Sequence, residues 1–205
     1  MPRMIGFGCW PSSAHSQRDT PMRRGESRNN MTARVEIRYL ADCPELVPKL
    51  ARWVCEEFGH LDSTKTPEQV ERMLRKRLNR DRLPLTLIAF AGSEPIGSAS
   101  LQNRGVSSRP QYAPWLGTVV VRRPHRNKGI GSQLVQRAAQ VARRLGVREL
   151  YLHTPDRESL YSRLGWMPVE RIPYRGQDTV IMKRNLAKEA STEGSTGPAT
   201  PRPKK

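Results

Sequence analysis

The chain contains one short basic segment, RNKGIGS, whose composition is typical of a phosphate-binding turn. Gly129 and Gly131 let backbone N–H groups approach an anion without a Cβ in the way. Arg126 and Lys128 add positive charge, and Ser132 adds a hydroxyl on the first turn of the helix that we expect to follow. The first amides of a helix have no partner within it and carry the positive end of its dipole. The segment therefore predicts an anion site at a helix N-terminus, although basic loops with glycine also occur without one.

The residues around this turn predict a strand, a helix and a second strand. Before the turn, residues 115–121 end in three β-branched valines, as strands often do. After it, apolar residues recur at steps of three and four, which indicates a helix ending at Gly146 in a C-cap position. Residues 147–152 then read as the next strand. The apolar positions of the helix are Ile130, Leu134, Val135, Ala138, Val141, Ala142 and Leu145.

Further elements complete one predicted domain over about residues 33–186. Alternating or continuous apolar runs predict strands, and capped apolar stripes predict helices. We expect strands at residues 35–39, 85–91, 96–101, 169–172 and 179–182, and helices beginning near Pro44, behind an Asp42 cap, and at Thr66. Residues 1–31 and 187–205 are polar and show no period, so we expect a disordered N-terminal extension and a disordered basic tail. Met22 or Met31 could be the start of translation.

The composition narrows the class of protein. The formal net charge is +17, and most of it lies within residues 32–186, which favours polyanions or acidic substrates. A nucleic-acid role is disfavoured, because the sequence has no helix-turn-helix and no basic surface interleaved with aromatic residues. No apolar run reaches membrane-spanning length, and no signal peptide is evident. Three scattered cysteines without metal spacing fit a cytoplasmic protein that binds no metal: Cys9, Cys43 and Cys55.

Two patterns carry a resemblance to a known family. The turn fits R/Q-x-x-G-x-G/A position by position from Arg126 to Gly131, and so resembles motif A of the GNAT acetyltransferase superfamily. A second family pattern, Y-x-x-x-G-F/W, follows from Tyr161 to Trp166, separated from the first by one predicted helix and one strand. The resemblance implies an α/β (α+β) fold with a mixed, mainly antiparallel sheet of roughly six to seven strands and about four flanking helices.

The resemblance also implies a cosubstrate, acetyl-CoA. Its pyrophosphate would lie at the turn, and its pantetheine arm would pair with the backbone of Val119 and Val121 like an added strand. Many relatives hold this arm with an asparagine seven residues before the tyrosine, where this chain has Thr154. The residues that the resemblance assigns to the coenzyme are Val119, Val120, Val121, Arg126, Asn127, Lys128, Gly129, Ile130, Gly131, Ser132 and Thr154.

Tyr161 and His153 are the predicted catalytic residues. Tyr161 corresponds to the tyrosine that hydrogen-bonds or protonates the coenzyme's sulfur in the family, and a phenol of pKa about 10 suits a thiolate of about 8.5. Residues 115–121 lack the glutamate that many members use as a base. Some amino-terminal acetyltransferases use a histidine on the next strand through water, and His153 resembles it, with a pKa of about 6.5. As alternatives to these catalytic roles, Tyr161 could be a core aromatic residue, and His153 could be a packed or capping histidine. Glu56, Glu57 and Asp156 are fallback bases.

The acceptor site is expected in two loops. In the family, the segment between the first two helices and the loop before the motif A strand face the acceptor. His60 and Asp62 in the first segment, and Arg104 and Tyr112 in the second, are therefore candidates for contact with the acceptor. His60 could equally be a loop histidine without a role. The run HTPDRE resembles the branch that contains the actin amino-terminal acetyltransferase, whose acceptor peptides are acidic. Basic residues would suit such a peptide: Arg104, Arg109 and Arg175.

We therefore predict an N-acetyltransferase that moves an acetyl group from acetyl-CoA to a primary amine, on a small molecule or a peptide amino terminus. Attack is expected to be direct, because no cysteine lies within either motif. A coenzyme A-binding regulator without turnover would be compatible with the missing glutamate, and a nucleic-acid-binding protein with the charge. We expect a monomer or homodimer that uses no metal and no membrane, with an acceptor that the sequence does not identify.

Overall fold

The computed structural model describes residues 35–58 and 66–187 of the chain. All of them belong to one compact unit, Ala33–Lys205. The predicted N-terminal extension and nearly all of the predicted tail lie outside the described residues, as do His60 and Asp62.

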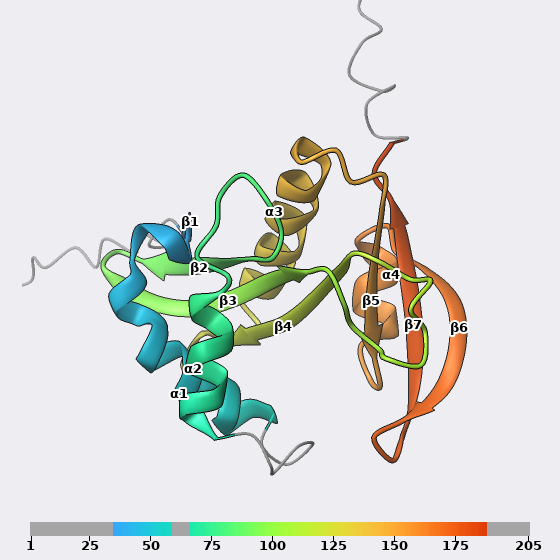
Figure 1. The fold of residues 1–205 in the computed structure, drawn as a ribbon, viewed down its shortest axis with the longest axis horizontal. Helices are drawn as coiled ribbons and strands as arrows, with labels where there is room; N and C mark the ends of the chain where they lie inside the picture. The colour runs from blue at the N-terminus through green and yellow to red at the C-terminus, as the bar shows by residue number, and fades with distance from the viewer. Residues whose placement is uncertain (1–34, 59–65, 188–205) are drawn as a thin grey trace, which may run out of the picture. The chain divides into compact units, whose positions relative to one another are not determined.

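Seven strands of the described part form one sheet in the order β1-β2-β3-β4-β5-β7-β6 (Figure 1). All neighbouring strands are antiparallel except β4 and β5, which run parallel. The predicted mixed, mainly antiparallel sheet is thereby confirmed. The strands are β1 (Val35–Tyr39), β2 (Leu85–Ala91), β3 (Glu94–Gln102), β4 (Trp115–Val121), β5 (Glu149–Thr154), β6 (Met167–Tyr174) and β7 (Gln177–Asn185).

Four α-helices accompany the sheet in the described residues, as expected: α1 (Val47–Phe58), α2 (Pro67–Arg75), α3 (Ile130–Arg144) and α4 (Glu158–Arg163). The predicted start of the first helix near Pro44 was wrong, because α1 begins only at Val47. Two short 3-10 turns, η1 (Leu40–Asp42) and η2 (Pro44–Leu46), precede it. The carboxylate of Asp42 accepts the N–H of Tyr39 at 3.3 Å and pairs with Arg80, so it closes the first turn and caps no α-helix.

The helices cover opposite faces of the sheet. Along β2, Leu85, Leu87 and Ala89 pack into one apolar cluster with residues of α3. Ile88 and Phe90 point to the other face, where they pack with α1 and α2. This alternation follows from the period of two along a strand. With both faces of the sheet covered around β2, ligands have access where the sheet itself opens.

The sheet opens between β4 and β5 (Figure 1). These parallel strands share a single register pair, Trp115 with Tyr151, and the N–H of Tyr151 also donates to the carbonyl of Pro114 at 3.0 Å. Both strands then continue without pairing to each other, while β5 stays paired to β7 along its length. The strand β5 begins at Glu149, two residues later than predicted, since Val147 bonds the end of α3 through its N–H and the Ala142 carbonyl.

A β-bulge lies in β4 at the point of divergence. Ser98 faces Val120 and Ser100 faces Gly117, so one residue of β3 lies opposite two residues of β4. Thr118, inside the bulge, has a φ of 55°. A β-branched residue in this left-handed region is strained. Because a bulge bends a strand and increases its twist, this one directs β4 away from β5.

Candidate active site

A cavity of about 670 Å³ opens where β4 and β5 diverge. Its walls come from α1, α2, the end of β3, both diverging strands, the segment leading into α4, and the hairpin of β6 and β7. Several of the residues predicted for the site line it: Glu57, Arg104, Val119, His153, Thr154, Asp156, Tyr161 and Arg175. The volume is within the range of small-molecule sites in proteins.

Tyr161 lies on α4 and is held by the second sequence motif. Gly165 has a φ of 81°, which allows the chain to reverse after α4, and the N–H of Trp166 donates to the Tyr161 carbonyl at 3.1 Å. Trp166 is only 2 % exposed, and its ring meets that of Tyr161 edge-on, with centroids 6.2 Å apart. Burial raises the pKa of Tyr161 to about 12; the charge of Asp156 adds to this shift and that of Arg157 opposes it. The phenol therefore keeps its proton at neutral pH and can donate it.

His153 lies on β5 between two aromatic rings. It meets Trp115 edge-on at 6.0 Å and Tyr174 at 5.1 Å, measured between ring centroids. Burial among these side chains lowers the pKa of His153, and the positive charge of Arg175 lowers it further. The residue is nevertheless open to solvent on the cavity side, and water there weakens both effects without reversing them. The lowered pKa of His153 favours its neutral form, which is able to accept a proton.

Thr154 has a structural partner within the site. Its side chain is 4 % exposed, and Oγ1 accepts the N–H of Arg157 at 3.0 Å. This contact closes the turn that leads from β5 into α4, and so it helps to place Tyr161. The pantetheine contact predicted for Thr154 stays a prediction.

The basic turn has the backbone expected of an anion site. Gly129 is the N-cap of α3 with a φ of 76°, no side chain caps the helix, and a Cβ on Gly129 would point into open space. Asn127 also has a positive φ, 60°, which asparagine tolerates better than most residues. Gly131 is different, because a Cβ there would only reach ordinary contact with Val121, at 3.8 Å. The backbone therefore requires glycine at Gly129 and not at Gly131.

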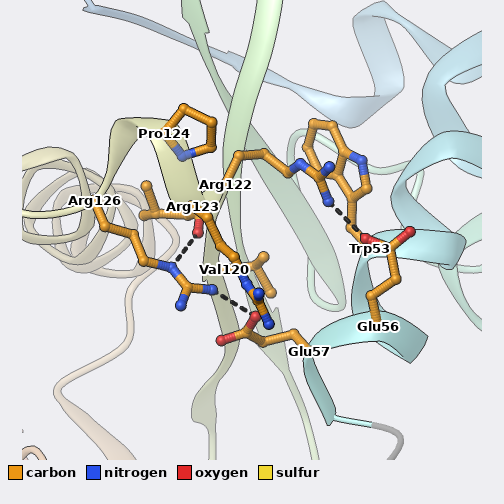
Figure 2. Close-up of a pocket in the computed structure, with 9 residues that line it drawn as sticks. Trp53, Glu56, Glu57, Val120, Arg122, Arg123, Pro124 and Arg126 are labelled. Atoms are coloured by element: carbon orange, nitrogen blue, oxygen red, sulfur yellow. Dashed lines mark hydrogen bonds and ion pairs between the residues drawn. The ribbon is translucent and has the colours of Figure 1, made fainter. Parts of the chain in front are cut away.

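Two arginines near this turn already have carboxylate partners, as Figure 2 shows. A groove of about 450 Å³ lies between the end of α1 and the segment after β4. Along it, Arg126 donates through Nε to the Val121 carbonyl at 2.9 Å and through Nη2 to Glu57 at 2.5 Å. Arg122 donates to Glu56 at 2.7 Å. Two of the three fallback bases, Glu56 and Glu57, thus pair with arginines, and Glu57 lines both this groove and the cavity.

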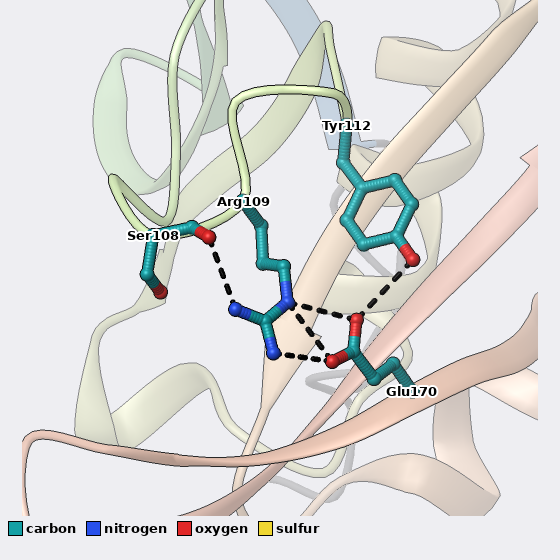
Figure 3. A network of polar contacts seen from close by, with 4 residues as sticks. All are labelled: Ser108, Arg109, Tyr112 and Glu170. Atoms are coloured by element: carbon teal, nitrogen blue, oxygen red, sulfur yellow. Dashed lines mark hydrogen bonds and ion pairs between the residues drawn. The ribbon is translucent and has the colours of Figure 1, made fainter.

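The loop before β4 is fastened to β6 (Figure 3). The Nε of Arg109 donates to both carboxylate oxygens of Glu170 at 2.9 Å, and Nη1 donates to the Ser108 carbonyl at 3.0 Å. Tyr112 donates to Glu170 at 3.2 Å and stacks on Tyr151 at 5.0 Å. Neither Arg109 nor Tyr112 is among the cavity residues, so in this structure both hold the loop in place. Of the basic residues expected at an acidic acceptor, Arg104 and Arg175 do line the cavity.

Arg77 and Gln102 are among the polar residues of the cavity that sequence reasoning missed. Arg77 follows α2 at the spacing of its buried residues, Val70 and Leu74. An arginine that continues the spacing of an apolar helix face indicates a buried side chain. The chain contains so many basic residues that Arg77 was not distinguished from exposed ones.

No group of three or more His, Cys, Asp or Glu within residues 35–58 and 66–187 could hold a metal ion. The same residues include no helix with the length and apolar character needed to cross a membrane.

Comparisons with known proteins agree with the geometry. Residues 47–166 match the sequence model of the acetyltransferase (GNAT) family. No curated protein matches the sequence. Three solved structures resemble the fold at low sequence identity, and at that identity they show the fold alone.

The first is an acetyltransferase of the GNAT family from Streptococcus pneumoniae, 22% identical, covering 74% of this chain and 99% of that chain, with a TM-score of 0.58. The second is aminoglycoside 6'-acetyltransferase type Ii, 19% identical, covering 82% of this chain and 99% of that chain, with a TM-score of 0.59. The third is yncA from Salmonella typhimurium, solved with its cofactor acetyl-CoA, 21% identical, covering 74% and 94% of the two chains, with a TM-score of 0.57.

Proposed function

The chain belongs to the acetyltransferase (GNAT) family and is an acetyl-CoA-dependent acetyltransferase, and we propose that it transfers the acetyl group to a primary amine by direct attack. One observation carries this proposal. A single cavity at the divergence of β4 and β5 is lined by a phenol, Tyr161, whose pKa burial raises to about 12, and by an imidazole, His153, whose pKa burial lowers. Amine acetylation needs one group that accepts a proton and one that gives a proton.

The start of α3 and the edge of β4 have the features needed to bind acetyl-CoA. The uncapped start of α3 at Gly129 offers backbone N–H groups to a pyrophosphate, and residues 126–132 would hold it there. Beyond Trp115, the edge of β4 has no partner in β5, so the backbone of residues 119–121 can pair with an extended pantetheine arm. When bound, acetyl-CoA supplies an activated thioester at the end of that arm.

The proton transfers follow from the two pKa shifts. His153 would accept the proton that the attacking ammonium must lose, directly or through a water molecule. Tyr161 Oη would give its proton to the departing sulfur. The two glutamates on α1 are less suited to the base role, because Arg122 and Arg126 already bind their carboxylates. Asp156 also lines the cavity and is the remaining alternative base.

To identify the acceptor, a panel of candidate amines is assayed, including amino acids, aminoglycosides and short peptides with acidic amino termini. Release of coenzyme A thiol from acetyl-CoA is measured with and without each amine. We expect amine-dependent thiol release for at least one class, with the acetylated product confirmed by mass. Tight coenzyme binding by calorimetry without any amine-dependent release would instead indicate a binding protein without turnover. If the resemblance to the actin amino-terminal acetyltransferase branch extends to the acceptor, peptides with acidic amino termini should give the fastest thiol release of this panel.

A further inference from the structure

Arg77 is a buried cation on the wall of the cavity. It follows α2, is 6 % exposed and lines the cavity beside Gln102. Its Nη2 donates to Oε1 of Gln102 at 2.7 Å. Its Nη1 is shielded from solvent and has no hydrogen-bond partner in the described part of the chain. A buried guanidinium thus has one neutral partner and an unused donor.

Within residues 35–58 and 66–187, no acidic side chain pairs with Arg77. Burial is the one cause that lowers its pKa, to about 10, so the guanidinium stays protonated at neutral pH. Three arginines outside this cavity differ, since Arg109, Arg122 and Arg126 each bind a carboxylate. Buried charges are ordinarily paired, because removing a charge from water is costly. Arg77 lies on the cavity wall, and in the described part of the chain it is bound to an amide and not to a carboxylate.

Gln102 is held in a position that serves Arg77. A Cβ on Gly117 would lie 2.4 Å from Nε2 of Gln102, so the glycine lets the amide lie close against β4. The amide oxygen is then turned toward Arg77. Arg104, from the neighbouring loop, adds a further positive charge to the same cavity. Around these polar groups the wall is apolar, formed by Val54, Val70 and Met73.

We propose that Arg77, positioned by Gln102, binds a carboxylate of the acceptor, so that the enzyme acetylates the amine of a small amino-acid-like molecule. The inference rests on the proposed function, since it assigns the acceptor of that reaction. A guanidinium fork matches a carboxylate with two parallel hydrogen bonds. Rotation of the Arg77 side chain would turn the shielded Nη1 toward the ligand. The cavity of about 670 Å³ favours a small acceptor over a folded one.

The test compares matched acceptors that differ only in the carboxylate. Amino acids, their amides and the corresponding amines without a carboxylate are each assayed by thiol release. We expect kcat/KM for the acid to exceed that for its amide by about 100-fold, as for a lost hydrogen bond to a charged group. In Arg77→Met this ratio should fall close to one, mainly through KM. In Arg75→Gln, on the exposed side of α2, the ratio should keep its wild-type value.

A second measurement separates binding from structure. Calorimetry with the N-acetylated amino acid should show binding to the wild-type protein and at least about 30-fold weaker binding to Arg77→Met. The melting temperature of Arg77→Met should not fall, because it loses a buried, unbalanced charge. If Arg77→Met does not fold, Gln102→Leu provides the same comparison. Equal use of acids and amides by the wild-type protein overturns the inference and leaves the proposed function intact. The absence of turnover with every amine would overturn both.

Discussion

Tyr161 and His153 lie in one cavity, but their surroundings shift their pKa values in opposite directions. Burial disfavours the charged form of each group, which is the phenolate for Tyr161 and the imidazolium for His153. The pKa of Tyr161 is raised to about 12, and that of His153 is lowered. The same physical cause therefore favours the protonated phenol of Tyr161 and the neutral imidazole of His153.

Changing Tyr161 to Phe should lower kcat by about 100-fold and leave the affinity for acetyl-CoA nearly unchanged, since a general acid acts in the transition state. The edge-on contact with Trp166 needs only the ring, so the variant should melt at the wild-type temperature. Stopped-flow thiol release and calorimetry measure the two quantities. An unchanged kcat would remove Tyr161 from the mechanism.

The dependence of kcat/KM on pH should reflect the protonation of His153. A base acts only when unprotonated, so kcat/KM should fall as the pH drops through the lowered pKa of His153, and this acid limb should lie below about pH 6.5. Arg175→Gln should move the limb to higher pH, because the positive charge that lowers the pKa is removed. In His153→Gln the limb should disappear and kcat/KM should fall about 100-fold. A limb that persists in His153→Gln points to Asp156 as the base.

At the scale of elements, the end of α1 and the turn before α3 meet through ion pairs. Glu57 binds Arg126 and lines both the groove and the cavity. A phosphate at the turn would compete with this carboxylate for the guanidinium. The pair joins residues that lie far apart in the sequence, and this is why Arg126 could be predicted from its motif but its partner could not.

Glu57→Gln should tighten coenzyme binding by roughly two- to fivefold, as expected when an exposed ion pair stops competing. The gain should shrink as salt is added, because salt screens exposed charges. Isothermal titration calorimetry at two salt concentrations measures this effect. Weaker binding in Glu57→Gln would show that the carboxylate positions Arg126 and does not compete with the ligand.

The glycines of the turn give a matched pair of variants. Gly129→Val should abolish detectable coenzyme binding, because valine disfavours a φ of 76° and its side chain enters the space that a phosphate would fill. Gly131→Ala should bind within about threefold of the wild-type protein, since its Cβ finds ordinary van der Waals room. Equal losses in both variants would mean that the motif acts through helix stability and not through an anion site.

Local patterns predicted most elements but not every boundary. The period of α3 and the cap at Thr66 depend on near neighbours, so they could be read directly, and Thr66 does exchange hydrogen bonds with Gln69. The errors arose where a neighbouring turn took residues from an element. The η2 turn uses Pro44 before α1 begins, and the end of α3 uses Val147 before β5 begins.

At the scale of the molecule, the mixed, mainly antiparallel sheet was expected from the family resemblance and not from strand propensity, and the strand order was not predicted. Strand patterns give no information about which strands become neighbours, so the parallel junction of β4 and β5 could not be derived from Val119 or Leu152 alone. The apolar clusters on the two faces of β2 were predictable from alternation. Arg77 was not, because its importance depends on Gln102 and Gly117, which reach it only through the folded sheet.

The divergence of β4 and β5 has a consequence for the behaviour of the protein in solution. Past Trp115 and Tyr151, two strand edges face each other with no register pair between them in the described part of the chain. An open edge of this kind can accept an extended segment from another polypeptide. Acetyl-CoA bound along that edge would also cover it, so a high concentration of the coenzyme would protect the protein against self-association through this edge.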